Sequence, residues 1–304
     1  MTGAVALGGI VAIPVTPFDE QLNIDELSLR RQVEFVVKSG VGGVLANVNA
    51  SEWYTLSDEE RARAAEIIVG EVAAQLPVFI GVTAQSTNST IELARHAEKI
   101  GAAGVNAMPP PHLQLSEEGC AGFYTQLCRA VDLPVVLQNY YPPLGTPMST
   151  QAIAGCAAGL DNLRYVKEET LPEPLKITAL LSALEGTRAV DGVFGGQGGV
   201  YLIDELQRGA TGNMPACHIA DALAKVWEAW DRGDRDEAAR LHTRLLPMLV
   251  FERCYGGVPV YKAVLVRRGV IRFAGTRAGT NALDDLAHRQ LIGIISAIED
   301  LFTI

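Results

Sequence analysis

One lysine, Lys167, follows an apolar approach in the stretch LRYVKEET at residues 163–170, and Glu168 and Glu169 come directly after it. Lysine is rarely buried, so a lysine at the end of a buried strand needs an explanation. Burial there favours the neutral amine, which attacks a ketone to form a Schiff base, and the iminium then withdraws electrons. The alternative is a solvated lysine paired with one of the two glutamates. Position alone leaves both interpretations open.

The chain around Lys167 repeats a unit of helix and strand. SGVGGVLANV at 39–48, IGAAGVNAMP at 100–109 and QRGATGNMP at 207–215 share a Gly-x-x-Gly spacing, in which the first glycine is expected to end a helix in a left-handed cap. A second kind of strand is entered through Leu-Pro-Val, at 75–82 and 132–139. Proline prevents the preceding helix from continuing. Amphipathic segments between these strands predict helices.

These units predict a TIM (β/α)8 barrel. Strands rich in Val, Ile and Ala are typical of parallel sheets that are buried on both faces. A doubly wound open sheet is the alternative, but it normally has fewer units and a nucleotide fingerprint. Residues 1–215 are predicted to form the barrel and residues 216–304 a C-terminal helical extension. The eight strands are expected near residues 9–15, 43–48, 77–82, 104–108, 134–138, 163–167, 188–193 and 210–214.

In such a barrel the reactive groups lie at the C-terminal ends of the strands. Lys167 closes the predicted sixth strand and should therefore face the mouth of the barrel. The glycine-rich loop at 192–202 follows the predicted seventh strand. Loops there often bind anionic groups, although a plain tight turn is the alternative.

Composition restricts the partners. The 304 residues are 48% hydrophobic with a net charge of −10, and the 25 Lys and Arg form no long run, so nucleic acid or an anionic membrane surface is not expected. The opening segment reads as a first strand and not as a signal peptide, and no apolar run is long enough for a membrane span. Five cysteines without CxxC spacing suit reduced thiols and a cytoplasmic location. Neither a cofactor nor a metal is expected, since the five histidines lack metal-ligand spacing.

Several motifs resemble the dihydrodipicolinate synthase / N-acetylneuraminate lyase family of class I aldolases. They are TPF at 16–18, Glu52 followed by TLSDEER, VKE at 166–168, and the glycine-rich loop. The resemblance implies a TIM barrel with three C-terminal helices, usually a homodimer or homotetramer. It also implies that Lys167 binds pyruvate or another 2-keto acid as a Schiff base.

The carboxylate-binding turn departs from the family pattern Gly-Thr-Thr-Gly-Glu, because the chain has Val48, Asn49, Ala50, Ser51 and Glu52 there. Two hydroxyls are lost, yet backbone N–H groups and the Asn49 amide could still hold a carboxylate. The resemblance therefore implies substrate binding at positions 49–51. A polar capping turn is the alternative, and Glu52 is expected to orient the turn.

The catalytic tyrosine of the family's Tyr-Asn-x-Pro motif is replaced by Gln138, with Asn139, Tyr140 and Tyr141 following. An amide can hydrogen-bond a substrate hydroxyl but cannot shuttle protons. Tyr140 or Tyr141 could bring a phenol into the same space. The resemblance therefore implies catalytic roles for Lys167, Gln138 and Tyr140, and a substrate contact at Asn139.

Two further departures argue against a dihydrodipicolinate synthase. The segment PPLGTPMS at 142–149 lacks the arginine that grips the second substrate, and His112 stands roughly where a neighbouring subunit's tyrosine is expected. We expect His112 to be a surface residue. The segments around Gln138, Lys167 and the glycine loop resemble instead the 2-keto-3-deoxy-L-arabonate dehydratases. The implied substrate contacts in this part of the chain are Gly196, Gln197, Gly198 and Met214.

The sequence therefore predicts a lyase that uses a lysine Schiff base, either a dehydratase or an aldolase, acting on a 2-keto acid, preferably a 2-keto-3-deoxy sugar acid. One alternative is a condensation of pyruvate with an aldehyde, as in dihydrodipicolinate synthase. Another is a non-catalytic barrel that binds a 2-keto acid and has lost its acid–base tyrosine. A metal-dependent aldolase lacks ligands.

Overall fold

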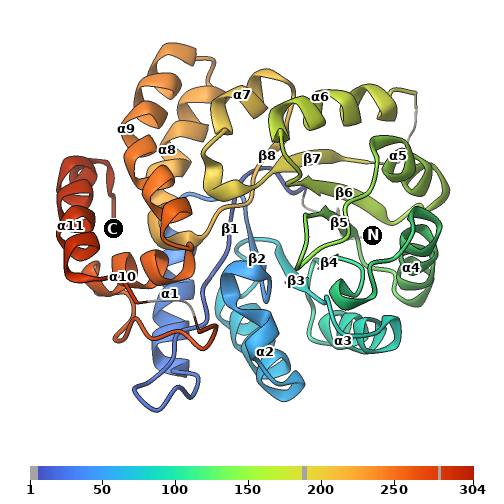
Figure 1. Cartoon of the computed structure of the whole chain (residues 1–304), viewed down its shortest axis with the longest axis horizontal. Helices are drawn as coiled ribbons and strands as arrows, with labels where there is room; N and C mark the ends of the chain where they lie inside the picture. Colours follow the sequence, from blue (N-terminus) through green and yellow to red (C-terminus); the bar gives the residue numbers. More distant parts are fainter. Residues whose placement is uncertain (1–5, 187–189, 280–281) are drawn as a thin grey trace.

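The computed structural model describes residues 6–186, 190–279 and 282–304. Eight parallel strands pair in chain order, and the eighth pairs with the first, so the sheet closes into a barrel (Figure 1). The predicted TIM barrel is thus confirmed. The strands are β1 (Gly9–Ala12), β2 (Gly43–Ala46), β3 (Val78–Gly81), β4 (Gly104–Ala107), β5 (Val135–Asn139), β6 (Leu163–Glu168), β7 (Gly192–Gly195) and β8 (Gly212–Asn213).

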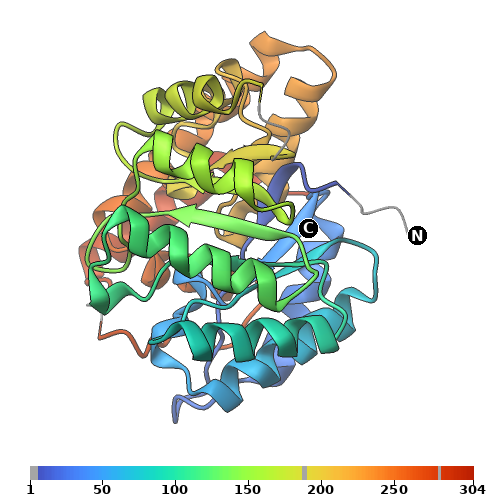
Figure 2. The same ribbon diagram turned by 90° about the vertical axis from the view of Figure 1, so that its right-hand side faces the viewer.

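Helices surround the barrel. Figure 2 shows α3, α4 and α5 side by side on its outer face. Serine and aspartate begin several helices by accepting a backbone N–H, and Ser57 forms a full capping box with Glu60 at the start of α2. The helices that follow the eight strands are α1 (Glu26–Lys38), α2 (Asp58–Val72), α3 (Thr87–Lys99), α4 (Glu117–Ala130), α5 (Thr150–Gly159), α6 (Glu173–Leu184), α7 (Leu202–Gln207) and α8 (Ala220–Asp231).

The helix-ending glycines behave as predicted. Gly40, Gly101 and Gly209 have φ angles of 73°, 83° and 99°, the left-handed region that glycine adopts most easily. The predicted seventh strand is shifted. Arg188 and Ala189 of the predicted range lie outside the described residues, and the strand observed starts at Gly192.

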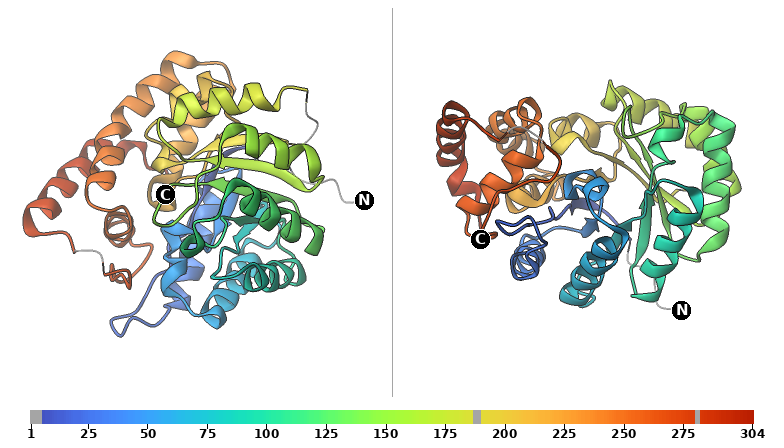
Figure 3. Two further views of the ribbon diagram at one scale, coloured as in Figure 1. Left: turned by 45° about the vertical axis from the view of Figure 1, so that its right-hand side comes forward. Right: turned by 60° about the horizontal axis from the view of Figure 1, so that its bottom comes forward.

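The helical extension consists of α9 (Arg235–Cys254), α10 (Val258–Arg267) and α11 (Asp285–Ile298). Both views of Figure 3 show these helices gathered on one side of the barrel, away from α3 and α4. The predicted division at residue 215 stays a prediction, since α8 contacts β1 and α1 of the barrel and also packs against α9 of the extension.

The barrel interior is filled by one cluster of side chains, which includes Val11, Leu45, Phe79, Tyr165 and Phe194. Successive residues of a strand point to opposite faces. Lys167, two residues after Tyr165, therefore points to the same inner side, one layer closer to the mouth. No helix in these described ranges is both long and apolar enough to cross a membrane.

Candidate active site

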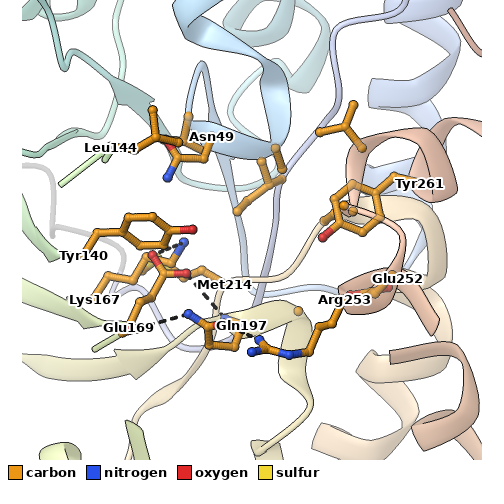
Figure 4. A pocket seen from close by; sticks show the side chains of 18 of the residues that line it. Asn49, Tyr140, Leu144, Lys167, Glu169, Gln197, Met214, Glu252, Arg253 and Tyr261 are labelled. Atoms are coloured by element: carbon orange, nitrogen blue, oxygen red, sulfur yellow. Dashed lines mark hydrogen bonds and ion pairs between the residues drawn. The ribbon is translucent and has the colours of Figure 1, made fainter. Parts of the chain in front are cut away.

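A cavity of about 380 Å³ opens at the C-terminal ends of the strands (Figure 4). Loops after β2, β5, β6 and β7 form much of its wall, and α9 and α10 of the extension close it from the side. The predicted site residues that line it are Asn49, Ala50, Tyr140, Lys167, Gln197, Gly198 and Met214. The other predicted site residues, Ser51, Gln138, Asn139 and Gly196, are absent from its lining.

Lys167 is buried and also paired. Its side chain is only 4% exposed, and its Nζ lies 3.2 Å from Oε2 of Glu169, a side chain that is 8% exposed. Both residues line the cavity. Glu168 points elsewhere, since its carboxylate accepts hydrogen bonds from Asn139 and from the backbone N–H of Thr170, at 2.8 and 2.7 Å. The lysine therefore shares the cavity with one carboxylate, Glu169, at hydrogen-bonding distance.

Gln138 holds Glu169 in place. In the strand register, Gln138 on β5 lies opposite Lys167 on β6. Its Nε2 donates to Oε2 of Glu169 at 2.6 Å, and its Oε1 accepts from Nδ2 of Asn106 at 2.7 Å. Asn139 is equally occupied, because its Nδ2 donates to Glu168 and its Oδ1 accepts from the backbone N–H of Met148. The Gln138 amide thus contacts Glu169 from outside the cavity lining.

Tyr140 and Tyr141 line the cavity as a stacked pair, with ring centroids 4.2 Å apart. The Tyr140 hydroxyl donates to the Tyr141 hydroxyl at 3.2 Å. Burial, together with the charge of Glu169, raises the pKa of Tyr140 above its usual range. Tyr140 therefore stays a neutral phenol, which can donate a hydrogen bond to a substrate oxygen but is a poor base.

The turn after β2 presents an unpartnered donor. A short 3-10 helix, η1 (Asn49–Ser51), begins there, and Asn49 Oδ1 accepts a hydrogen bond from Trp53 at 3.0 Å. This bond leaves Asn49 Nδ2 buried and without a partner, although Asn49 lines the cavity. Ser51 turns away and donates its hydroxyl to the carbonyl of Pro14 at 2.7 Å. A buried donor without a partner is costly, and an anionic oxygen in the cavity would satisfy it.

The glycine loop after β7 wraps around Glu169. A Cβ on Gly196 would lie 2.2 Å from Oε1 of Glu169, and one on Gly198, at φ +72°, would lie 2.1 Å from Oε1 of Glu252. Gln197 donates its Nε2 to the carbonyl of Glu169 at 3.1 Å and its backbone N–H to Glu169 Oε1 at 3.4 Å. A side chain at either position would have to displace a buried glutamate carboxyl, so glycine lets the loop approach both carboxylates closely.

The extension contributes residues that the sequence patterns did not indicate. Glu252 and Arg253 at the end of α9 and Tyr261 on α10 line the cavity. Glu252 lies 2.9 Å from Nε2 of His218, both side chains 1% exposed, and the His218 ring packs against Tyr261 with centroids 4.7 Å apart. Burial raises the pKa of Glu252. The Glu-Arg pair in the sequence looks like an ordinary solvated end of a helix, so no local signal distinguished it.

A second pair of carboxyls supports the loop from below. Glu173 and Glu205 are both fully buried. Glu173 accepts the Gly196 N–H at 2.6 Å, and Glu205 accepts from Nδ2 of Asn213 at 2.7 Å. Burial and the neighbouring carboxyl raise the pKa of Glu173, and burial raises the pKa of Glu205 to about 7. At least one of the two is therefore expected to carry a proton near neutral pH.

His112 is exposed on the short 3-10 helix η3 (Pro111–Leu113) and does not line the cavity. Within the described part of the chain, no group of three or more His, Cys, Asp or Glu side chains is placed to hold a metal ion. The charged lining residues are thus Lys167, Glu169, Glu252 and Arg253.

Comparison with known proteins gives consistent relatives. A model of the dihydrodipicolinate synthetase family matches residues 6–298. An L-2-keto-3-deoxyarabonate dehydratase from Azospirillum brasilense is 28% identical over 296 residues, which cover 96% of this chain and 95% of the relative. A 4-hydroxy-tetrahydrodipicolinate synthase from Pelobacter propionicus is 34% identical over 241 residues, covering 79% of this chain and 80% of that protein.

Solved structures agree with these relatives. The crystal structure of a dihydrodipicolinate synthase from Rhodopseudomonas palustris superimposes with a TM-score of 0.88 at 30% sequence identity. The match covers 95% of this chain and 97% of that one, so the barrel and the extension are both shared.

Proposed function

The chain belongs to the dihydrodipicolinate synthetase family, whose members are lyases that form Schiff bases, and we propose that it dehydrates a 2-keto-3-deoxy sugar acid held on Lys167. The chain is accordingly an enzyme of the class I lyase type, and the non-catalytic alternative is set aside. One observation carries the proposal: a buried lysine amine lies 3.2 Å from a single carboxylate at the floor of a cavity.

The reaction begins with condensation at the 2-keto group. The Lys167 nitrogen bonds to C2, and the carbonyl oxygen leaves as water with two of the three ammonium protons. Glu169 is placed to carry those protons, because it lies beside the lysine and is fixed by Gln138. The product of this step is an iminium, which acidifies the hydrogens on C3.

Lys167 and Glu169 also carry out the elimination. Glu169 takes a proton from C3, and the electron pair forms an enamine. The hydroxyl on C4 then departs and receives that proton, so one water leaves and Glu169 returns to its carboxylate form. Tyr140, a neutral phenol, is proposed to turn its hydroxyl hydrogen from Tyr141 to the departing oxygen. Hydrolysis of the conjugated iminium releases the product and restores the Lys167 amine.

The acid–base properties of Gln138 and Tyr140 support dehydration rather than aldol cleavage. Cleavage of the C3–C4 bond requires a base that takes the proton of the C4 hydroxyl. Glu169 serves C3 in the proposed mechanism, the family's tyrosine is replaced by Gln138, which does not titrate, and Tyr140 is held neutral by its surroundings. Elimination needs only a donor at that oxygen, which a neutral phenol provides.

The carboxylate of the keto acid is proposed to bind at the turn after β2. Asn49 Nδ2 lacks a partner, and Asn49 and Ala50, which line the cavity, begin the short helix η1, where the first backbone N–H groups have no partner within the helix. We further propose, from the family, a homo-oligomer, either dimer or tetramer, and, from the five free cysteines, a cytoplasmic location.

The decisive experiment is borohydride trapping with pyruvate and a panel of 2-keto-3-deoxy sugar acids, followed by intact mass and peptide mapping. We expect reduction to attach the acid to Lys167, and one sugar acid to be consumed with loss of one water. An adduct at another residue, or no adduct with any keto acid, would refute the mechanism. If the enzyme condenses pyruvate with an aldehyde and converts no sugar acid, the proposed substrate class is wrong.

A further inference from the structure

Arg253 is a charged lining residue that the proposed mechanism does not use. We propose that it binds a second carboxylate, at the end of the substrate remote from the keto group, so that the site prefers 2-keto acids that are diacids. This inference rests on the proposed function and specifies its substrate class. It concerns the wall of the cavity formed by the extension, not the catalytic floor.

The position of Arg253 carries the first part of the argument. It lies in the last turn of α9, lines the cavity, and donates a hydrogen bond from Nη1 to Oε1 of Gln197. In the view of Figure 4, Arg253 and Asn49 approach the cavity from opposite sides, with Lys167 and Glu169 beside Tyr140. The proposed site for the first carboxylate and the Arg253 guanidinium are therefore at different walls.

The charge of Arg253 carries the second part. Lys167 is paired with Glu169, and Glu252 is in contact with His218. Arg253 forms no ion pair within 4.0 Å with any carboxylate of the described residues. Its Nη1 donates to the neutral amide of Gln197, and its Cζ lies 6.0 Å from the ring centroid of Tyr201. Arg253 is an exposed residue at the rim of the cavity, and a guanidinium there, with no carboxylate of the described ranges within 4.0 Å, can receive an anionic group of a ligand.

The carboxylate follows from the shape of guanidinium. It is a planar fork whose N–H groups match both oxygens of a carboxylate. Gln197 fixes one arm of this fork, and Gln197 is itself held by two hydrogen bonds to Glu169. The guanidinium is therefore oriented before substrate enters, which lowers the entropic cost of binding.

The test compares keto acids that differ only in the charge of the far end. The pairs are 2-oxoglutarate with 2-oxopentanoate, and 2-oxoadipate with 2-oxohexanoate, and pyruvate serves as the short reference. The rate of borohydride inactivation against keto acid concentration gives an apparent Kd for each. We expect the wild type to bind at least one diacid about 10-fold more tightly than its neutral-ended partner, as one charge-assisted hydrogen-bonded pair allows.

The variant Arg253→Gln should reduce that ratio to about one and leave the apparent Kd of pyruvate unchanged. Arg240→Gln is the matched control on the same helix, because Arg240 is exposed, paired with Glu237 at 2.7 Å and absent from the cavity lining. It should retain the diacid preference.

Three results would overturn the inference. The wild type could show no preference in either pair, or Arg253→Gln could retain the preference. Equal weakening of pyruvate, diacid and neutral-ended acid in Arg253→Gln would assign Arg253 to positioning Gln197 instead. Absence of any adduct, including with pyruvate, is a distinct outcome that refutes the proposed function and this inference together.

Discussion

Lys167 and Lys262 are both buried, and each is paired with a glutamate, at 3.2 Å to Glu169 and at 2.6 Å to Glu52. The first pair lies on the floor of the cavity. The second lies between the barrel and the extension and lines no part of that cavity. A buried lysine with an acidic partner therefore occurs twice in this chain with different surroundings.

The surroundings of Lys262 are saturated. Its Nζ also donates to the carbonyl of Gly275 at 2.7 Å and lies 4.2 Å from the ring centroid of Phe18. Glu52 Oε1 accepts the backbone N–H groups of Arg277 and Ala278. Burial lowers the pKa of Lys262 to about 8. A lowered pKa by itself therefore does not identify a reactive amine, and access to a cavity is the better criterion.

The largest effect that tests this contrast is loss of the first amine. Lys167→Ala should lower kcat/KM about 10⁴-fold or more, since removal of a covalent nucleophile leaves only binding and electrostatic contributions. It should also abolish the borohydride adduct with pyruvate. Activity assays and intact mass measure the two effects.

Lys262→Met is the matched variant for that experiment. Molecules that remain folded should keep the adduct at Lys167, because Lys262 does not face the cavity. An adduct on Lys262 in the Lys167→Ala protein would contradict the distinction between the two lysines.

This contrast also shows what the sequence could predict. Lys167 was found because it ends an apolar strand, a local pattern. Lys262 sits in VPVYKAVLVRRG, which predicts only a helix. Its burial depends on Glu52, more than 200 positions earlier, and sequence spacing carries no information about such a contact.

Most of the fold could also be predicted from local sequence patterns. Glycines at helix ends and Leu-Pro-Val strand entries marked most of the barrel. The seventh strand is predicted at 188–193, but β7 begins only at Gly192, because Asp191 is exposed and paired with Arg164. Helix α8 packs against both the barrel and α9, and an amphipathic pattern does not say which neighbours its apolar face will meet.

The sequence indicated Lys167 at the floor of the cavity, but it did not indicate the residues of the wall that the extension forms. Gln138 is predicted to be catalytic, and this role stays a prediction; the sequence did not show that its amide is engaged by Asn106 and Glu169, because that arrangement is set by neighbouring strands. Arg253 and Tyr261 reach the cavity only because the extension folds back over the barrel mouth.

The next largest effect should come from the partner of Lys167. Glu169→Gln keeps an oxygen to accept the Gln138 hydrogen bond but removes the base, so kcat should fall about 10²- to 10⁴-fold. Trapping of pyruvate should persist, because condensation places the smaller demand on this base. Single-turnover kinetics and borohydride trapping separate the two steps.

Glu168→Gln provides the neighbouring control. Glu168 is bonded to Asn139 and Thr170 and does not line the cavity, so its folded variant should keep turnover within a few-fold of the wild type. Equal losses in the two variants would indicate a general disturbance of β6 and count against Glu169 as the base.

The second pair should matter for stability instead. Lys262→Met leaves Glu52 buried without its cation, and removal of one partner from a buried ion pair costs about 3–5 kcal/mol in the free energy of unfolding. Chemical denaturation measures this loss. The double variant Glu52→Gln with Lys262→Met should recover part of it, since no uncompensated charge remains.

The pH dependence gives an independent check on Lys262. Its folded-state pKa, about 8, is below the ordinary value of 10.5. The unfolded chain therefore binds more protons between these values, and stability gains a contribution as pH rises from about 8 to 10.5. Lys262→Met should lose this rise. Its persistence in the variant would assign the rise to other groups.

The smallest effect concerns the two buried carboxyls, Glu173 and Glu205, beneath the glycine loop. The pKa of Glu205 is raised from 4.5 to about 7, so the folded state holds a proton that the unfolded chain releases. The resulting stabilisation is fully present below pH 4.5 and is lost as pH rises through about 7, a change of at most about 3 kcal/mol at 1.36 kcal/mol per pKa unit. Glu205→Gln should flatten this fall in denaturation curves taken from pH 4.5 to 8, because its amide can donate to Glu173 and accept from Asn213 without titrating. Asp204→Asn, at the exposed neighbouring position, should keep the wild-type slope, and an unchanged slope in Glu205→Gln would show that the two carboxyls do not share a proton.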